Sequence, residues 1–124
     1  MNLYREQILD HYKHPRNFGK LTGAHVSSEE VNMSCGDKIR IEIILSGNRI
    51  EDIRFTGEGC AINQAAASML TEKVKGKSVA EIMKLDLQYV EGLLGTTLTP
   101  SRVKCAMLPL EAIQKAIWTQ TTQK

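Results

Sequence analysis

Three cysteines and one aspartate are the residues of this 124-residue chain whose types and placement could do chemistry together. Cys35 lies two residues before Asp37, and the glycine between them permits the sharp turn that would let thiolate and carboxylate face one point. Cys60 and Cys105 lie far downstream, so only the folded chain could bring the four side chains together. Three thiolates and a carboxylate would form a tetrahedral site for zinc or for iron bridged by sulfide.

Each cysteine taken alone also has a plainer interpretation. A cysteine can pack in a core as a small apolar side chain, and in isolation we favour that interpretation for Cys60. The three local contexts nevertheless agree, because the cysteines stand beside glycines, strand ends or helix starts, where ligands and nucleophiles are usually presented. Cys60 falls at or just before the first turn of a predicted helix, where free amide groups and the helix dipole favour a thiolate.

The residues that precede Cys60 predict a small antiparallel sheet. Isoleucine or leucine occupies every second position from Ile39 to Leu45, which indicates a strand with one buried face. A tight reversal is expected at Gly47-Asn48, both of which can adopt positive backbone dihedral angles. The predicted strands cover three stretches: residues 24–32, residues 38–45, and a third that contains Ile53 and Phe55 and ends at 56–59.

Helices are predicted at both ends of the chain and after Cys60. Leu3 to Lys13 carries apolar residues at the four-residue step and ends before a proline segment. The helix after Cys60 is expected to end at Gly76. Two short helices should follow, one opened by a capping box at 78–81 and one running from Asp86 to near Gly95.

The last helix is the one whose start the sequence leaves open. Thr99-Pro100 has the form of an N-cap followed by proline at the first helical position. Pro109 stands inside the apolar pattern that follows, so the helix either kinks there or begins near Pro109. In both cases Cys105 lies in its first turns or just ahead of them.

The three histidines are interpreted as surface or capping residues rather than ligands: His11, His14 and His25. None has a motif context that would pair it with a cysteine. A conventional thiol hydrolase is therefore disfavoured.

Composition restricts the class of protein. The length suits a single domain over residues 1–124, and 42% hydrophobic with 24% charged residues is ordinary for a globular protein. A net charge of +2 without a lysine or arginine run argues against nucleic acid as a partner, and the lack of a long apolar run argues against a membrane span. The start lacks the apolar core of a signal peptide, so we expect a cytoplasmic protein. An odd number of cysteines favours a metal or catalytic role over disulfides.

Several motifs together resemble one known family almost from end to end. Residues 4–12 followed by 14–19, Tyr-Arg-Glu-Gln-Ile-Leu-Asp-His-Tyr and His-Pro-Arg-Asn-Phe-Gly, are similar to the opening of the U-type iron–sulfur cluster assembly scaffolds: IscU, SufU and the N-terminal domain of NifU. The three cysteine motifs of that family are matched by Cys35-Gly36-Asp37, by Gly57-Glu58-Gly59-Cys60-Ala61-Ile62 with the helix at 65–68, and by Arg102-Val103-Lys104-Cys105.

The resemblance implies a fold, a site and partners. The fold would be α+β, with one small three-stranded antiparallel sheet packed against several helices. The site, near one end of the molecule, would consist of Cys35, Asp37, Cys60 and Cys105 and hold zinc in one state and a [2Fe–2S] cluster, with its iron, in another. A cysteine desulfurase would donate sulfur as a persulfide, and apo iron–sulfur proteins or carrier proteins would receive the product. The resemblance leaves open whether the chain is a monomer or a homo-oligomer.

Two departures from IscU affect the expected mechanism. IscU carries histidine directly before the third cysteine, whereas this chain has Lys104, the SufU pattern. Lys104 is poorly suited to zinc while protonated, so Asp37 becomes the favoured fourth ligand and Lys104 an accessory charge or a solvated side chain. SufU usually has an insertion between the second and third cysteines, and this chain has none.

Three functions therefore compete. We favour an assembly scaffold, which is not an enzyme and in which Cys105 would accept the sulfur. The alternative is a SufU-like zinc-dependent sulfur carrier, with Cys35 as acceptor. A zinc-stabilised interaction module with inert thiols is less favoured.

Overall fold

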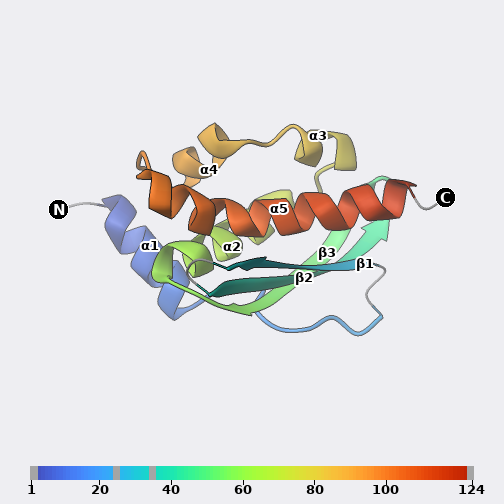
Figure 1. The fold of residues 1–124 in the computed structure, drawn as a ribbon. Helices are drawn as coiled ribbons and strands as arrows, with labels where there is room; N and C mark the ends of the chain where they lie inside the picture. The colour runs from blue at the N-terminus through green and yellow to red at the C-terminus, as the bar shows by residue number, and fades with distance from the viewer. Residues whose placement is uncertain (1–2, 24–25, 34–35, 123–124) are drawn as a thin grey trace.

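The chain folds as three layers in which a sheet is covered by helices (Figure 1). The computed structural model describes residues 3–23, 26–33 and 36–122. Within these ranges the elements are α1 (Leu3–Lys13), β1 (Val26–Asn32), β2 (Asp37–Ser46), β3 (Arg49–Glu58), α2 (Ala61–Val74), α3 (Val79–Met83), α4 (Leu87–Leu94) and α5 (Pro100–Thr122). The α+β class predicted from the sequence is confirmed.

The sheet is antiparallel with strand order β1-β2-β3, as predicted. Its inner face is apolar because alternate residues of β2 and β3 point the same way, and five of them are fully buried: Ile39, Ile41, Ile43, Ile53 and Phe55. At the reversal Gly47 has φ of 63°, but Asn48 does not have a positive φ, contrary to prediction. One glycine is therefore sufficient for this turn.

Helices α2 and α5 lie on the inner face of the sheet, and α3 and α4 form an outer layer beyond them (Figure 1). Helix α5 packs against β1 and β2, whereas α2 packs against β3 and carries α1. The predicted helix ends are confirmed: Ser78 and Glu81 form a capping box, Asp86 caps α4, and Gly95 ends it with φ of 75°. None of the helices in these ranges is long and apolar enough to cross a bilayer.

Helix α5 begins at Pro100 and continues through Pro109, so a start near Pro109 is excluded. The residues around the proline are buried against the other elements, including Leu108, Ala112 and Ile113. Tertiary packing of this face outweighs the local preference of proline to end a helix. Cys105 consequently lies within α5, in its second turn.

His11 is buried, and the prediction that it lies on the surface is wrong. Its side chain faces α2, where Nδ1 lies 2.7 Å from Ser68 Oγ, and the backbone N–H of Arg16 donates to the same oxygen at 2.8 Å. Helix α1 thus buries His11, while Tyr12, the next residue along the helix, stays 45% exposed. His14 is exposed as predicted, and His25 lies outside the described residues.

The burial of His11 predicts a specific pH dependence of stability. Desolvation, assisted by the nearby charge of Arg16, lowers the pKa of His11 from its ordinary value of 6.5. The folded state therefore resists protonation, and the contribution of His11 to stability should be lost as the pH falls below about 6.5. We expect His11→Gln to lower the urea midpoint at pH 7.5 and to have a smaller effect at pH 5.5, in chelator-treated protein. His14→Gln is the matched control, and a loss for His11→Gln that is equal at both pH values would contradict the account.

Candidate metal centre

Three elements converge on one point at the end of the molecule where α1 lies (Figure 1). Asp37 begins β2, Cys60 is the N-cap of α2, and Cys105 belongs to α5. One ligand atom of each lies within 4.8 Å of the others, and Cys60 Sγ is 3.8 Å from Asp37 Oδ2. The structure thus brings together three of the four residues predicted as ligands, while Cys35 lies outside the described residues.

The three donor atoms fit a tetrahedral metal site after a small contraction. Zinc–sulfur bonds of 2.3 Å separate two sulfurs by about 3.8 Å in a tetrahedron. A spread of 4.8 Å therefore needs to close by about 1 Å at most, which side-chain rotation can supply. Thiolates suit zinc or iron–sulfur chemistry rather than magnesium or calcium, which prefer oxygen donors.

A left-handed turn places Asp37 in the site. Gly36 has φ of 78°, a conformation that side chains disfavour, and its N–H donates to the carbonyl oxygen of Asn32 at 2.8 Å. Asn32 and Asp37 are paired across β1 and β2, so the turn and the sheet register together fix the carboxylate. Asp37 is only 4% exposed, whereas Cys60 is open to solvent.

Gly59 lets the strand end approach the site closely. A Cβ atom at this position would lie 2.7 Å from Asn63 Oδ1 and 2.9 Å from Asp37 Oδ1, both too close for a side chain. Gly59 is therefore required for space rather than for an unusual φ. Gly57 has a different role, because a Cβ there would collide with the backbone carbonyl of Lys38 in the neighbouring strand.

Cys105 is nearly buried but lines an open pocket. The residue is 8% exposed, and its Sγ lies 3.8 Å from the carbonyl oxygen of Ser101, a weak hydrogen bond. The pocket has a volume of about 400 Å³ and is lined by Cys60, Ala61, Ile62, Ser101, Arg102 and Cys105. A reactant that enters it meets both thiols.

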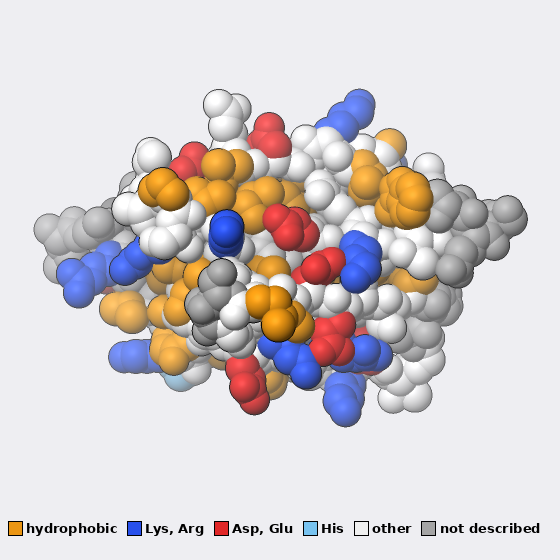
Figure 2. Space-filling model, viewed as in Figure 1, with side chains coloured by type: hydrophobic (Ala, Val, Ile, Leu, Met, Phe, Trp, Pro, Cys, Tyr) orange, Lys and Arg blue, Asp and Glu red, His pale blue; other side chains and the backbone are white. Residues whose placement is uncertain are grey.

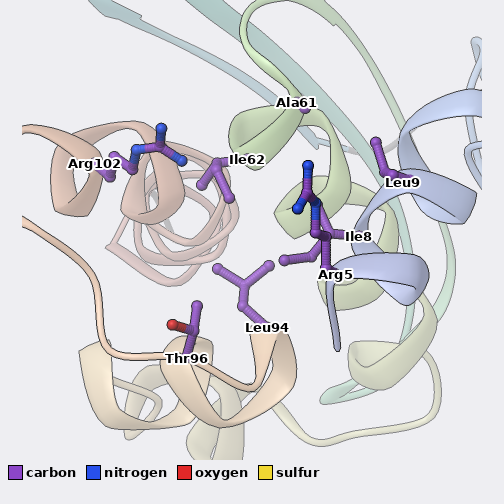
Figure 3. Close-up of a pocket in the computed structure, with 8 residues that line it drawn as sticks. All are labelled: Arg5, Ile8, Leu9, Ala61, Ile62, Leu94, Thr96 and Arg102. Carbon is purple, nitrogen blue, oxygen red and sulfur yellow. The ribbon is translucent and has the colours of Figure 1, made fainter. Parts of the chain in front are cut away.

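A second hollow shares a wall with this pocket. It measures about 430 Å³ and is lined by Arg5, Ile8, Leu9, Ala61, Ile62, Leu94, Thr96 and Arg102. Figure 3 shows Arg5 and Arg102 on either side of an apolar centre that contains Ile62 and Leu94. We call this hollow the two-arginine groove. Apolar and basic side chains also lie side by side over α1 on the face seen in Figure 2.

Arg102 and Ser101 are pocket residues that the sequence analysis did not single out. On a helix, positions three and four residues before Cys105 share its face, so helical spacing could have found them. Lys104, one residue before Cys105, is exposed and lines a separate hollow of about 280 Å³ with Leu108 and Glu111. Its role as an accessory charge stays a prediction.

Known proteins resemble this chain over nearly its whole length. A sequence model of the NifU-like N-terminal domain matches residues 3–124. A zinc-dependent sulfurtransferase, SufU of Bacillus subtilis, is 39% identical over 93% of this chain and 89% of its own length. The iron–sulfur cluster assembly scaffold protein IscU 1 of Archaeoglobus fulgidus is 38% identical over 93% of this chain and 74% of its own.

Solved structures agree with the fold. A crystal structure described as a putative iron–sulfur cluster assembly scaffold protein for the SUF system, from Fervidobacterium islandicum, superposes with a TM-score of 0.76. It is 31% identical in sequence, with 90% of this chain and 94% of that one covered.

The two sequence alignments differ in length. The Bacillus alignment spans 132 positions and the Archaeoglobus alignment 115, although both cover 93% of this chain. The Bacillus relative therefore carries residues within the aligned region that this chain lacks. This agrees with the prediction that the chain lacks the insertion usual in SufU, but alignments of similar length to two relatives named as IscU scaffolds show that such extra residues are not confined to SufU.

The close approach at Gly59 yields a test of the site. Gly59→Ala should displace Asn63 and Asp37 and lower zinc affinity about 10- to 100-fold, as loss of support around a metal ligand commonly does. Chelator competition measures the affinity. The matched control is Gly92→Ala, because a Cβ at Gly92 meets nothing within 4 Å, and its zinc affinity should equal that of the wild type. Unchanged affinity in Gly59→Ala would show that neither side chain needs its present position for metal binding.

Proposed function

The chain belongs to the NifU-like N-terminal domain family, and on this premise we propose that it is an iron–sulfur cluster assembly scaffold. It accepts sulfur from a cysteine desulfurase, assembles a [2Fe–2S] cluster on Cys35, Asp37, Cys60 and Cys105, and passes the cluster to apo-proteins or carrier proteins. The observation that carries the proposal is the convergence of Asp37, Cys60 and Cys105 within 4.8 Å beside an open pocket.

Sulfur transfer requires a thiolate that can reach the persulfide of the donor. The Cys105 thiolate attacks the terminal sulfur of that persulfide, the sulfur–sulfur bond of the donor breaks, and the donor cysteine leaves as a thiolate. The terminal sulfur then resides on Cys105, with no net oxidation. Its reduction to sulfide for the cluster takes two electrons from an external thiol or electron-transfer protein. The pocket lined by Cys60 and Cys105 supports this role, because it gives the nearly buried Cys105 a path to a donor.

Asp37 is suited to the release of the cargo. A carboxylate is a weaker partner than a thiolate for a soft metal site, so it exchanges more readily. Asp37 is buried beside Gly59, and this packing holds the carboxylate at the site when no metal bond does. Asp37 is therefore the ligand that gives way when an acceptor protein takes the cluster.

Zinc fits the same residues in a resting state. When bound, zinc would keep the ligating thiols deprotonated and close the donor set. With three thiolates and one carboxylate the site carries a net charge of −2, which nearby cations stabilise. Arg102 lines the cysteine pocket and Lys104 is adjacent in sequence to Cys105, so both could supply positive charge.

The two-arginine groove provides a surface for the desulfurase. It shares Ala61, Ile62 and Arg102 with the cysteine pocket, so a segment bound in the groove would lie beside the thiols. Its apolar centre and flanking Arg5 and Arg102 complement a segment with an apolar side chain next to carboxylates. We place the segment of the desulfurase that accompanies its persulfide there.

A second candidate function is that of a zinc-dependent sulfur carrier with Cys35 as acceptor. The similarity to the Bacillus sulfurtransferase and the lysine at position 104 favour it. The alignment to the Archaeoglobus scaffold spans 115 positions and covers 93% of this chain, so it opens no gap in this chain, and this length match favours the scaffold. We therefore rank the scaffold first.

Anaerobic reconstitution with iron, cysteine and a cysteine desulfurase tests the proposal. The scaffold account predicts a stable [2Fe–2S] absorption spectrum on the wild-type chain and its loss in Cys60→Ser. Faster desulfurase turnover without a cluster would contradict the scaffold and favour the carrier. An absence of both effects, with thiols inert to alkylation, would leave the zinc-stabilised module.

One variant separates docking from ligation in the same assay. Arg5→Glu reverses a charge that lines the two-arginine groove but not the cysteine pocket. It should raise the desulfurase concentration needed for half-maximal assembly and leave zinc content unchanged. An unaltered concentration dependence would remove the groove from the docking surface.

A further inference from the structure

Because of Pro109, the carbonyl group of Cys105 needs a hydrogen-bond donor from outside the usual helical pattern. In an α-helix the carbonyl of residue i accepts from the N–H of residue i+4, and for Cys105 that residue is Pro109. Proline has no backbone N–H, so helix α5 cannot make this bond in the usual way. The residue whose helical donor is missing is thus the one that carries the third thiol.

Asn63 of α2 donates to this carbonyl. Its Nδ2 lies 3.1 Å from the Cys105 carbonyl oxygen, and the bond is buried. A carbonyl oxygen can only accept, so the nitrogen of the amide must face it. The other end of the amide is also held, because Gln64 Nε2 donates to Asn63 Oδ1 at 3.0 Å. The orientation of the Asn63 side chain is therefore fixed at both ends.

The position of Asn63 connects it to the other members of the site. It is fully buried in the first turn of α2, three residues after Cys60. Asn63 Oδ1 and Asp37 Oδ1 both lie next to Gly59, because each would be within 3 Å of a Cβ atom placed there. A single amide thus joins the turn that carries Cys60 to the turn that carries Cys105.

We infer that Asn63 and Pro109 act as a pair that positions Cys105 relative to Cys60. Pro109 removes the donor within α5, and Asn63 replaces it with a donor from α2, so a bond that would be internal to one helix joins two helices. The separation of the two thiols then depends on this bond. The inference rests on the proposed function in one respect, namely that both thiols bind the same metal. The hydrogen bond itself can be tested without metal.

A purely structural role makes a different prediction. If Asn63 only satisfies a buried carbonyl, any other donor to that carbonyl would serve equally well. Pro109→Ala supplies such a donor, because the N–H of alanine at position 109 can complete the helical bond to Cys105. It restores the hydrogen bond within α5 without restoring the connection to α2.

The experiment is a double-mutant cycle with two readouts on the full chain. Asn63→Ala should raise the unfolding equilibrium constant of the chelator-treated protein about tenfold in the wild-type background. In the Pro109→Ala background the same change should cost several-fold less. Zinc affinity, measured by chelator competition on folded protein, should fall about tenfold or more in Asn63→Ala and should remain low in the double variant.

The combination of outcomes decides the inference. Stability that recovers in the double variant while zinc affinity stays low supports positioning by Asn63. Zinc affinity that recovers together with stability overturns positioning, and equal costs of Asn63→Ala in both backgrounds overturn the pairing with Pro109. Ser68→Ala is the matched control, because Ser68 is equally buried in α2 but bonds to His11, and it should lower stability without changing zinc affinity.

Failure of the proposed function would appear differently. If the wild-type chain neither bound zinc nor assembled a cluster, the scaffold would be refuted, while the unfolding cycle would still report on Asn63 and Pro109. If the wild type bound zinc and Asn63→Ala bound it equally well, the scaffold would stand and the positioning role would be refuted.

Discussion

The site depends on the convergence of three chain segments whose local structures are stable for separate reasons. Asp37 is fixed by the register of β1 and β2, Cys60 by the start of α2, and Cys105 by the packing of α5 across the sheet. Their donor atoms come within 4.8 Å of one another, and the lack of a side chain at Gly59 leaves room beside them for the Asp37 carboxylate and the Asn63 amide. Thiolates and a carboxylate at this distance repel one another when charged, so a cation is the natural partner of the arrangement.

The rest of the structure can be understood as support for this end of the molecule. Beneath the site lies an apolar core of isoleucine-rich strands against α2 and α5, which gives the donors a rigid base. A pocket lined by Cys60 and Cys105 keeps the thiols reachable, and the two-arginine groove shares a wall with it. A site that must load and release its cargo needs both properties, because a fully enclosed donor set would be a structural metal site and a fully exposed one would not hold the metal.

Local sequence patterns predicted the strands and helices well, because residues close together in the sequence determine where these elements begin and end. Alternation defined β2, a capping box defined α3, and an aspartate with a downstream glycine defined α4. The predictions were wrong or left alternatives open where a distant partner decides the outcome. His11 is buried because Ser68 of another helix provides a hydrogen bond, and α5 passes through Pro109 where Asn63 donates to the Cys105 carbonyl.

The proximity of three of the four candidate ligands was predictable from the motifs, but their surroundings were not. Asp37, Cys60 and Cys105 were predicted to meet and do so, whereas Cys35 lies outside the described residues. Arg102 and Asn63 were missed as site residues because their roles arise from helix faces that only the packed structure brings together. Arg102 lies three residues before Cys105 and Asn63 three residues after Cys60. This helical spacing from a cysteine is the sequence signal that could have identified both.

The central claim is that one metal is held by three thiolates and one carboxylate. X-ray absorption spectroscopy of the zinc-loaded chain tests it most directly, because the nearest shell of atoms around zinc distinguishes sulfur from oxygen. We predict a shell of three sulfurs at about 2.3 Å and one oxygen at about 2.0 Å. A shell with two or fewer sulfurs, completed by nitrogen or oxygen, would contradict the account.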